Sequence, residues 1–386
     1  MNIQATDFQE IREGILSLFK RFPDEYFRKV DTERAYPGEF VKAFIDAGWL
    51  SAMIPEQYGG SGMGLVEASV IMEQVNRSGG NAGALHGQMY NMGTLLRHGS
   101  KEQKERYLPE IACGNLRIQS MGVTEPTAGT DTTKIRTTAV KRGDRYIVNG
   151  QKVWISRVQH SDLMVLLART TPVSEVKRKS DGMSIFIVDL REVIGKGMEV
   201  RPIPNMVNHE TNELFFENME IPEENLIGEE GRGFKYVLDG LNAERTLIAA
   251  ECIGDGYWFI ERAANYANER VVFDRPIGEN QGVQFPLAES YIEVEAANLM
   301  RYKAAELFDA KKPCGAEANM AKYLAAKASW EAANACLQTH GGYGFACEYD
   351  VERKFRETRL YPVAPISTNL ILSYIAEYIL GLPRSF

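Results

Sequence analysis

Two adjacent charged residues, Glu244 and Arg245, interrupt an apolar helical pattern in the segment GFKYVLDGLNAERTLIAAE. Continuing the apolar stripe places both charges where apolar side chains are expected, so we expect them to point toward a core or a cleft. Burial of a carboxylate raises its pKa, which suits it to act as a general base near neutral pH. A structural ion pair is the competing interpretation, and Glu251, two turns further along, is the competing carboxylate. The stripe consists of Phe234, Val237, Leu238, Leu241 and Ile248.

Other patterns that could support chemistry are weak. The five cysteines are scattered without a C-x-x-C pair, and the five histidines have no metal-ligand spacing. We therefore expect a reducing, cytoplasmic environment and no metal site. The glycine clusters GEEGRGF at 228–234 and GGYGF at 341–345 fit neither phosphate-loop pattern, so a Rossmann domain or a Walker loop is not expected.

Composition limits the class of protein further. The chain has 386 residues, of which 44% are apolar and 25% charged, as in globular proteins with two or three domains. Its 44 Lys and Arg against 52 Asp and Glu give a net charge of −8, the wrong sign for a nucleic-acid binder. No apolar run is long enough for a membrane span, and the first 20 residues lack a signal-peptide core.

Three regions follow one another along the chain. Helical periodicity dominates to about residue 115, short alternating segments occupy about 117–225, and long helical patterns return after GEEGRGF. Gly143-Asp144 and Asn149-Gly150 are typical turn dipeptides, which predicts hairpins and an antiparallel β domain. We expect an N-terminal helical domain at 1–116, a β domain at 117–228 and a C-terminal helical domain at 229–386. This order argues against a doubly wound parallel sheet.

Ordered motifs over nearly the whole length resemble the acyl-CoA dehydrogenase family. They are GWLSAMIPEQYGGSGM at 48–63, GSKEQKERYLPEIACGNLR at 99–117, MGVTEPTAGTDTTKIRTTAVKRGDRYIVNGQKVWIS at 121–156, ERVVFDRPIGENQ at 269–281 and QTHGGYGF at 338–345. The resemblance implies a helical domain, a central β-barrel-like domain and a C-terminal four-helix bundle. It also implies FAD bound without a Rossmann fold, and a homo-oligomer, either tetramer or dimer.

The matched positions imply how FAD is held. Val123 and Thr124 match residues that line the flavin, and Trp154 and Ser156 match residues that border its ring and its N5 edge. In relatives, an R-x-x-F…Q set and a Q-x-x-G-G set contact FAD across a subunit interface. A guanidinium suits a pyrophosphate because it donates bidentate bonds, and glycine lets the backbone approach closely. The two sets correspond here to Arg270, Phe273, Gln281, Gln338, Gly341 and Gly342.

The resemblance implies α,β-dehydrogenation of an acyl-CoA thioester, in which a carboxylate removes the α-proton and hydride passes to flavin N5. Most relatives place the base in a C-terminal E-G-[TS] segment, but here Pro365 occupies that place. A minority, including long-chain and isovaleryl-type enzymes, place it on an earlier helix immediately before an arginine. Glu244 occupies that position, so it is the expected base, with Arg245 holding the local helix or a CoA group. Thr130 would offer a hydroxyl to the substrate.

Two departures from the family affect the expected reaction. Relatives bind the thioester oxygen with a backbone N–H at the place of Pro365, and proline has no such donor. Ala364 or Ile366 would have to supply the N–H, unless the flavin ribityl hydroxyl acts with another partner. Asp274 stands where relatives usually have Gly.

We expect electrons to pass to an electron-transfer flavoprotein. The alternatives are an oxidase or monooxygenase on the same fold, and a non-enzymatic CoA-binding member.

Overall fold

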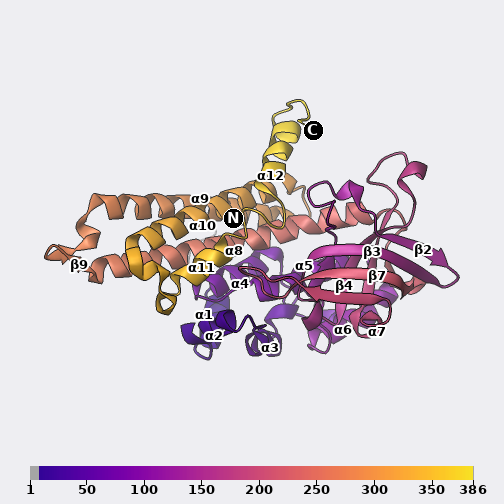
Figure 1. Cartoon of the computed structure of the whole chain (residues 1–386), viewed down its shortest axis with the longest axis horizontal. Coiled ribbons are helices and arrows are strands. Elements are labelled where there is room, and N and C mark those ends of the chain that lie inside the picture. The colour runs from indigo at the N-terminus through magenta and orange to yellow at the C-terminus, as the bar shows by residue number, and fades with distance from the viewer. Residues whose placement is uncertain (1–7, 386) are drawn as a thin grey trace. The chain divides into compact units, whose positions relative to one another are not determined.

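A computed structural model describes residues 8–385, which form two compact units (Figure 1). Of the described residues, the first unit combines 8–37 with 64–82 and 242–385. The second unit combines residues 38–63 with 83–241. The long helix α8 (Gly233–Glu269) contributes its first nine residues to the second unit and the rest to the first.

The first unit is helical and is built around α8, α9 and α10 (Figure 1). Alanines on α10 are fully buried against α8 and α9, because small side chains let helix backbones approach closely and favour the helical conformation. A short hairpin, β9 (Val271–Val272) and β10 (Arg275–Pro276), joins α8 to α9. Besides α8, its helices are α1 (Gln9–Phe19), α2 (Asp24–Thr32), α4 (Leu65–Arg77), α9 (Gln281–Asp309), α10 (Gly315–His340), α11 (Val351–Thr358) and α12 (Thr368–Tyr374).

Helix α8 is buried on every side over 243–259. The sequence predicted one buried apolar stripe, whereas all sides of the helix are buried over this range. Leu238, which was assigned to the stripe, lies before this range and is 43% exposed. A helix enclosed by neighbours on all sides has no solvent face, so every ionisable side chain on it must find a partner inside the unit.

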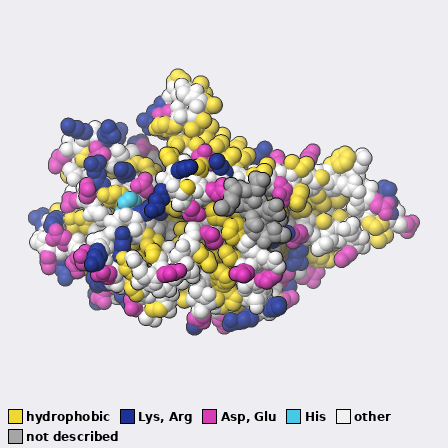
Figure 2. Space-filling model, turned by 180° about the vertical axis from the view of Figure 1, so that it is seen from behind, with side chains coloured by type: hydrophobic (Ala, Val, Ile, Leu, Met, Phe, Trp, Pro, Cys, Tyr) yellow, Lys and Arg dark blue, Asp and Glu magenta, His cyan; other side chains and the backbone are white. Residues whose placement is uncertain are grey.

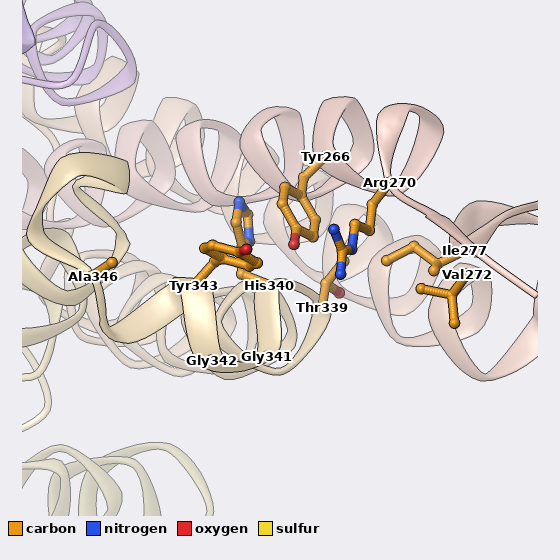
Figure 3. A pocket seen from close by; sticks show the side chains of 10 residues that line it. All are labelled: Tyr266, Arg270, Val272, Ile277, Thr339, His340, Gly341, Gly342, Tyr343 and Ala346. Atoms are coloured by element: carbon orange, nitrogen blue, oxygen red, sulfur yellow. The ribbon is translucent and has the colours of Figure 1, made fainter.

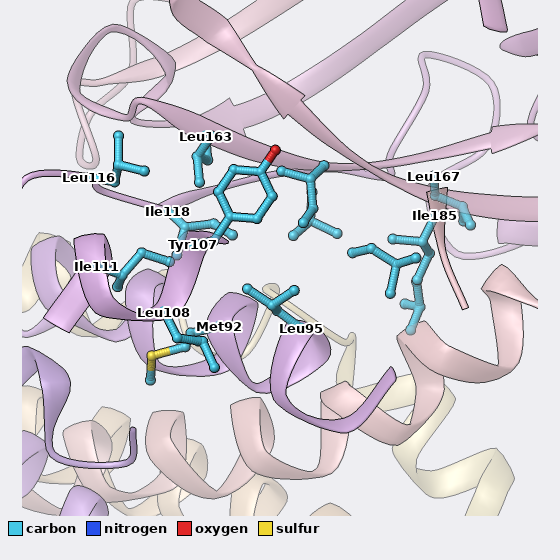
Figure 4. Close-up of a cluster of buried hydrophobic side chains, with 14 of the residues drawn as sticks. Met92, Leu95, Tyr107, Leu108, Ile111, Leu116, Ile118, Leu163, Leu167 and Ile185 are labelled. Carbon is cyan, nitrogen blue, oxygen red and sulfur yellow. The ribbon is translucent and has the colours of Figure 1, made fainter. Parts of the chain in front are cut away.

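The second unit packs helices against a sheet. Its helices are α3 (Gly38–Asp46), α5 (Gly83–His98), α6 (Lys101–Ala112) and the short α7 (Leu190–Val193). Figure 4 shows apolar side chains of α5 and α6, among them Met92, Leu95 and Leu108, meeting side chains of the sheet. One contiguous core therefore holds the sheet against these helices.

The sheet has the strand order β6-β7-β3-β2-β4-β5-β8, and β1 pairs with β4. Most pairs are antiparallel, as expected, but β4 runs parallel to β1 and to β2, so the sheet is mixed. The strands are β1 (Ser120–Gly122), β2 (Thr138–Arg142), β3 (Arg145–Ser156), β4 (Leu163–Arg169), β5 (Met183–Asp189), β6 (Met198–Pro202), β7 (Thr211–Pro222) and β8 (Leu226–Ile227).

The position of β4 in the sheet explains why all of its residues but the last are apolar, without the alternation of a half-exposed strand. Leu163, Val165 and Leu167 face the core shared with α5 and α6, whereas the side chains between them enter a second core on the other face. Both faces are covered, so neither set of side chains needs to be polar. The predicted order of helical, β and helical regions is confirmed; the exact domain bounds stay a prediction.

One predicted turn is confirmed and the other is wrong. Gly143 and Asp144 link β2 to β3 as a two-residue turn, and Gly143 has a φ of 62°. Gly150 lies inside β3, with a φ of 148°, where the pairing with β7 shifts register. A Cβ on Gly150 would lie 2.5 Å from the Thr137 hydroxyl oxygen, so glycine is required by a close approach and not by a turn.

The C-terminal helix α12 begins after Ser367, whose hydroxyl accepts a hydrogen bond from the backbone N–H of Leu370 at 3.4 Å. Within residues 8–385, no helix is both long and apolar enough to cross a membrane. The same residues contain no group of three or more His, Cys, Asp or Glu side chains placed to hold a metal ion.

A buried ion pair in the first unit provides a test of its stability. The Arg301 guanidinium lies 2.5 Å from the Glu73 carboxylate, and both side chains are fully buried. Replacing Arg301 by Met should lower the free energy of unfolding by about 3 kcal/mol, because it deprives a buried carboxylate of one partner. Urea unfolding followed by circular dichroism measures the change.

The matched control is Lys327→Met, which removes an exposed cation 3.9 Å from Glu293 in the same unit. Exposed pairs contribute less than about 1 kcal/mol. If Arg301→Met cost no more than this control, the buried pair would not be stabilising the unit.

Candidate active site

Glu244 and Arg245 are both buried on α8, with 6% and 9% of their surfaces exposed. The Arg245 guanidinium donates to the Asn242 side-chain oxygen at 2.8 Å. Burial lowers the pKa of Arg245 to about 10, and the charge of Glu244 opposes this shift. The predicted burial of the two charges is thus correct, although the cause is the enclosure of α8 on all sides.

Lys322 on α10 is a further buried cation near this pair, and sequence reasoning missed it. Its ammonium group donates to the backbone carbonyls of Tyr361 at 2.6 Å and Ile366 at 2.7 Å. Burial lowers the pKa of Lys322 to about 8, with Glu244 opposing the shift and Arg245 adding to it. The sequence could have indicated its burial, because Lys322 lies between Ala321 and Ala325 in the apolar stripe of α10.

The segment held by Lys322 contains Pro365. The backbone N–H of Ala364 donates to the carbonyl of Leu360 at 3.0 Å, so this donor is already engaged. The N–H of Ile366 makes no hydrogen bond to any residue in the described part of the chain. Of the two alternatives to the missing proline N–H, only Ile366 therefore offers a donor that a ligand could use.

Glu251, the competing carboxylate, is held by structural partners. The Tyr361 hydroxyl donates to the Glu251 carboxylate at 3.2 Å, and the Asn76 amide donates to the Glu251 carbonyl at 3.1 Å. All three residues belong to the first unit, and Glu251 is fully buried. These bonds favour a structural role for Glu251.

An open cleft of about 600 Å³ lies at the opposite end of α8 (Figure 3). The Arg270 guanidinium lies 5.6 Å from the centre of the Tyr343 ring, and Tyr266 stacks on His340 with ring centres 4.2 Å apart. The cleft offers a cation and aromatic faces, which together suit the phosphates and base of a nucleotide. Its lining residues are Tyr266, Arg270, Val272, Ile277, Thr339, His340, Gly341, Gly342, Tyr343 and Ala346.

Two glycines form one wall of this cleft. Gly341 has a φ of 58°, which disfavours a side chain, and a Cβ on Gly341 or Gly342 would meet no atom within 4 Å. The backbone is thus open to close approach by a ligand. The cleft brings together three of the six residues predicted for the interface side of FAD: Arg270, Gly341 and Gly342.

The other three predicted residues lie outside the lining of the cleft. Phe273 is 94% exposed in the turn between β9 and β10, Gln281 is the first residue of α9, and Gln338 lies in the last turn of α10. Asp274, the departure from the family, has a φ of 62°, a conformation that Asp adopts more readily than most residues. The substitution is therefore compatible with the turn.

Glu244 and the cleft are far apart within the first unit. Arg270 directly follows α8 and is 26 residues beyond Glu244, which corresponds to about 39 Å along a helix. A single unit therefore carries two separate groups of predicted residues, one at each end of its longest helix.

The predicted flavin contacts of the second unit meet on β3. The pairing of β3 with β7 shifts register between Lys152 and Ile155, and Trp154 in this bulge has a φ of 62°. Trp154 is 59% exposed although its neighbour Ile155 is buried. A bulge turns a side chain away from the regular alternation of a strand, so the ring is presented at the surface.

The T-E-P segment is tied to the same strand. The carbonyl of Thr124 accepts from the backbone N–H of Val153 at 2.9 Å, and the carbonyl of Val123 accepts from the Lys152 ammonium at 2.9 Å. Lys152 is also paired with Glu125 at 2.9 Å. These bonds bring Val123 and Thr124 beside the bulge.

Ser156 ends β3, and its hydroxyl oxygen accepts from the Asn208 amide at 2.8 Å. That bond uses the oxygen as acceptor, so the hydroxyl proton remains available for donation. Thr130 is exposed and makes no hydrogen bond within residues 8–385, so its hydroxyl is accessible. The second unit thus presents an aromatic face and two hydroxyl groups.

Comparison with known proteins gives matches along the chain. The models described as the N-terminal, middle and C-terminal domains of acyl-CoA dehydrogenase match residues 6–115, 120–219 and 231–380. The acyl-CoA dehydrogenase fadE12 of Mycobacterium bovis is 34% identical over 389 residues, covering 100% of this chain and 98% of that protein.

Two solved structures, each 30% identical, show the same fold. A glutaryl-coenzyme A dehydrogenase in complex with glutaryl-CoA has a TM-score of 0.92 and covers 100% of this chain and 98% of its own. A structure of the electron transferring flavoprotein of Acidaminococcus fermentans also has a TM-score of 0.92, over 98% of this chain and 100% of its own. The chain therefore belongs to the acyl-CoA dehydrogenase family of flavoproteins and is an oxidoreductase.

Proposed function

We propose that the protein catalyses FAD-dependent α,β-dehydrogenation of an acyl-CoA thioester with Glu244 as the base. The observation that carries the proposal is the buried carboxylate of Glu244 beside Arg245, in a chain where Pro365 stands at the usual position of the base. Proline can neither accept a proton nor donate a hydrogen bond, so the chemistry needs another carboxylate.

The proton step is assigned to the Glu244 carboxylate, which takes the α-proton of the thioester. The positive charges of Arg245 and Lys322 favour the ionised carboxylate, and burial opposes it. FAD, when bound, supplies the acceptor for the β-hydride. Arg245 donates to Asn242 and Lys322 donates to two backbone carbonyls, and these bonds fix the positions of both cations.

Acidification of the α-proton requires a donor to the thioester oxygen, and we assign this role to the N–H of Ile366. Lys322 is its positioning residue, because its ammonium group binds the carbonyls of Tyr361 and Ile366 on either side of Pro365. An N–H fixed before the reaction costs no reorganisation when charge develops on the oxygen.

The residues present fit FAD. On the second unit, the exposed Trp154 ring can cover the flavin and the Ser156 hydroxyl proton can be donated to its N5 edge, with Val123 and Thr124 alongside. On the first unit, Arg270 suits the pyrophosphate, and Gly341 and Gly342 leave room for it.

The separation of about 39 Å between Glu244 and Arg270 supports a homo-oligomer, tetramer or dimer. This distance is longer than one FAD molecule reaches, so the Arg270 cleft would complete the cofactor site of a second copy. Exposed apolar residues on α9 recur every two turns, at Phe285, Ile292 and Leu299, as expected for a face covered by another chain. Figure 2 also shows hydrophobic side chains gathered on the projecting segment that contains α12.

Electrons would leave through an electron-transfer flavoprotein, a protein that is named in the description of one matched structure. The acyl-CoA substrate would come from acyl-CoA or fatty-acid metabolism, with Thr130 donating to it and Arg245 ordering the local helix or a CoA group. A cytoplasmic location stays a prediction.

Replacement of Glu244 by Gln tests the assignment of the base. The variant should bind FAD and the thioester, because the amide has the same shape, but it should lose bleaching of the flavin by acyl-CoA at least about 100-fold. Anaerobic stopped-flow absorbance of FAD-loaded protein against a panel of acyl-CoAs measures the rate.

The matched control is Glu251→Gln, which alters the competing carboxylate and should retain bleaching. Undiminished bleaching in the Glu244 variant, or loss confined to the Glu251 variant, would refute the assignment. Fast reoxidation of the bleached protein by air would favour an oxidase over transfer to a partner flavoprotein.

Replacement of Lys322 by Met tests the positioning role. Loss of an ordered oxyanion donor costs about 100-fold to 1,000-fold in kcat, and KM should change little because the thioester is still bound. Steady-state kinetics separates the two constants, with Lys327→Met as an exposed control on the same helix. An unchanged kcat, or a parallel loss of thioester binding, would contradict the role.

A further inference from the structure

Arg157 is a buried cation next to the residue assigned to the N5 edge of the flavin. It directly follows β3, and only 6% of its surface is exposed. Its guanidinium donates to the Asn208 side-chain oxygen at 3.2 Å, and its buried Nε has no hydrogen-bond partner within the described residues. From residue 8 to residue 385, no carboxylate forms an ion pair with it. Taking a guanidinium out of water without a carboxylate partner costs free energy, which indicates a role other than stabilising the fold.

The backbone at both ends of this contact is in the left-handed region. Arg157 has a φ of 60° and Asn208 has a φ of 56°. Asparagine adopts this conformation more readily than most residues, whereas arginine is seldom found in it. The backbone N–H of Arg157 donates to the carbonyl of Glu210 at 2.8 Å, which ties the end of β3 to the turn before β7. Two neighbouring strand ends thus hold a strained residue in place, as is common at functional sites.

The Asn208 amide can present either its oxygen or its nitrogen to a neighbour, and its partners decide which. Arginine has no hydrogen-bond acceptor, so the amide oxygen must face Arg157. The Thr211 hydroxyl donates its proton to the Asn208 carbonyl at 2.7 Å, so its oxygen accepts from the amide nitrogen at 2.9 Å. Both neighbours therefore require the same orientation of the amide.

This orientation points the amide nitrogen at Ser156. The nitrogen donates to the Ser156 hydroxyl oxygen at 2.8 Å, so the oxygen serves as the acceptor. The hydroxyl proton has no acceptor among residues 8–385, and it must turn away from Asn208. With the amide reversed, the amide oxygen would face Ser156 and would accept this proton. The direction of the Ser156 hydroxyl thus depends on Arg157, two hydrogen bonds away.

We propose that Arg157 is a positioning residue, which fixes the Asn208 amide so that the Ser156 hydroxyl donates to the N5 edge of bound FAD. The inference rests on the proposed function, which assigns Ser156 to that edge. Arg157, Asn208, Thr211 and Ser156 all belong to the second unit, so the chain of hydrogen bonds is complete within it. A donor that is oriented before the reaction costs no reorganisation when the reaction occurs.

The test uses the C4a–N5 stretching mode of oxidised FAD, because its frequency reports a hydrogen bond to N5 without any turnover. Resonance Raman spectra of protein loaded with FAD that carries nitrogen-15 at N5 identify the mode. Ser156→Ala should shift it, and Arg157→Met and Asn208→Asp should shift it too, since both leave the hydroxyl proton without a fixed outward direction. Arg157→Lys should keep the wild-type frequency, because an ammonium group is also a donor only.

FAD affinity gives a second readout. Fluorescence titration of the apoprotein should show binding weakened about twofold to tenfold in Ser156→Ala, Arg157→Met and Asn208→Asp, as expected for one lost hydrogen bond. The matched control is Arg169→Met, which removes another arginine of the second unit that is 6% exposed and donates to backbone carbonyls. It should keep the wild-type frequency and the wild-type affinity for FAD.

Arg157→Met and Asn208→Asp are also combined with Ser156→Ala, because a change of charge can move the mode through its electric field alone. An effect that passes through the hydroxyl should add nothing to the Ser156→Ala shift, whereas a field effect would add to it. A wild-type frequency in Arg157→Met or Asn208→Asp, or a further shift in either combination, would overturn the proposal.

An unshifted mode in Ser156→Ala would show that this hydroxyl does not reach N5, and would overturn both the positioning role of Arg157 and the flavin contact assigned to Ser156. The proposed reaction fails separately. If no acyl-CoA bleached the flavin, a shift shared by Ser156→Ala and Arg157→Met, with no further shift in their combination, would still support the positioning role.

Discussion

Several charged side chains of the first unit are buried away from water. The free energy of their desolvation determines how the side chains at the centre of this unit are arranged. Along the enclosed part of α8, Asp255 and Glu251 meet partners from other segments of the unit. Asp255 lies 2.5 Å from the Lys354 ammonium; burial raises the pKa of Asp255 to about 7, with Lys354 opposing the shift. Glu251 accepts from Tyr361. These groups have partners whose geometry accounts for their burial.

Glu244 lies near two buried cations. The cations near it, Arg245 and Lys322, direct their hydrogen bonds to Asn242 and to two backbone carbonyls. The positive charges of both residues favour the ionised form of the Glu244 carboxylate, which suits a group that must accept a proton during a reaction. Lys322 also orders the segment around Pro365, so the proposed base and the proposed oxyanion donor both depend on one buried side chain.

Sequence patterns predicted the order of the regions and the turn at Gly143-Asp144, because both depend on local periodicity or turn chemistry. The burial of Glu244 and Arg245 was also predicted, although it results from the enclosure of α8 on all sides and not from one apolar stripe. The turn assigned to Gly150 was wrong, since its conformation results from a close approach of Thr137 that no local pattern reveals. Lys322 was missed although it lies in an apolar stripe. The contact of Arg157 with Asn208 could not be predicted, because the two residues are 51 positions apart in the chain.

The central claim is that Glu244 removes the α-proton, and hydrogen exchange at that carbon tests it without dependence on electron transfer. The FAD-loaded protein is incubated in D2O with a thioester analogue that binds but is not dehydrogenated, and α-deuterium is followed by mass spectrometry. The wild-type protein should incorporate deuterium, and Glu244→Gln should do so at least about 100-fold more slowly at equal occupancy. Exchange at the wild-type rate in that variant would contradict the account.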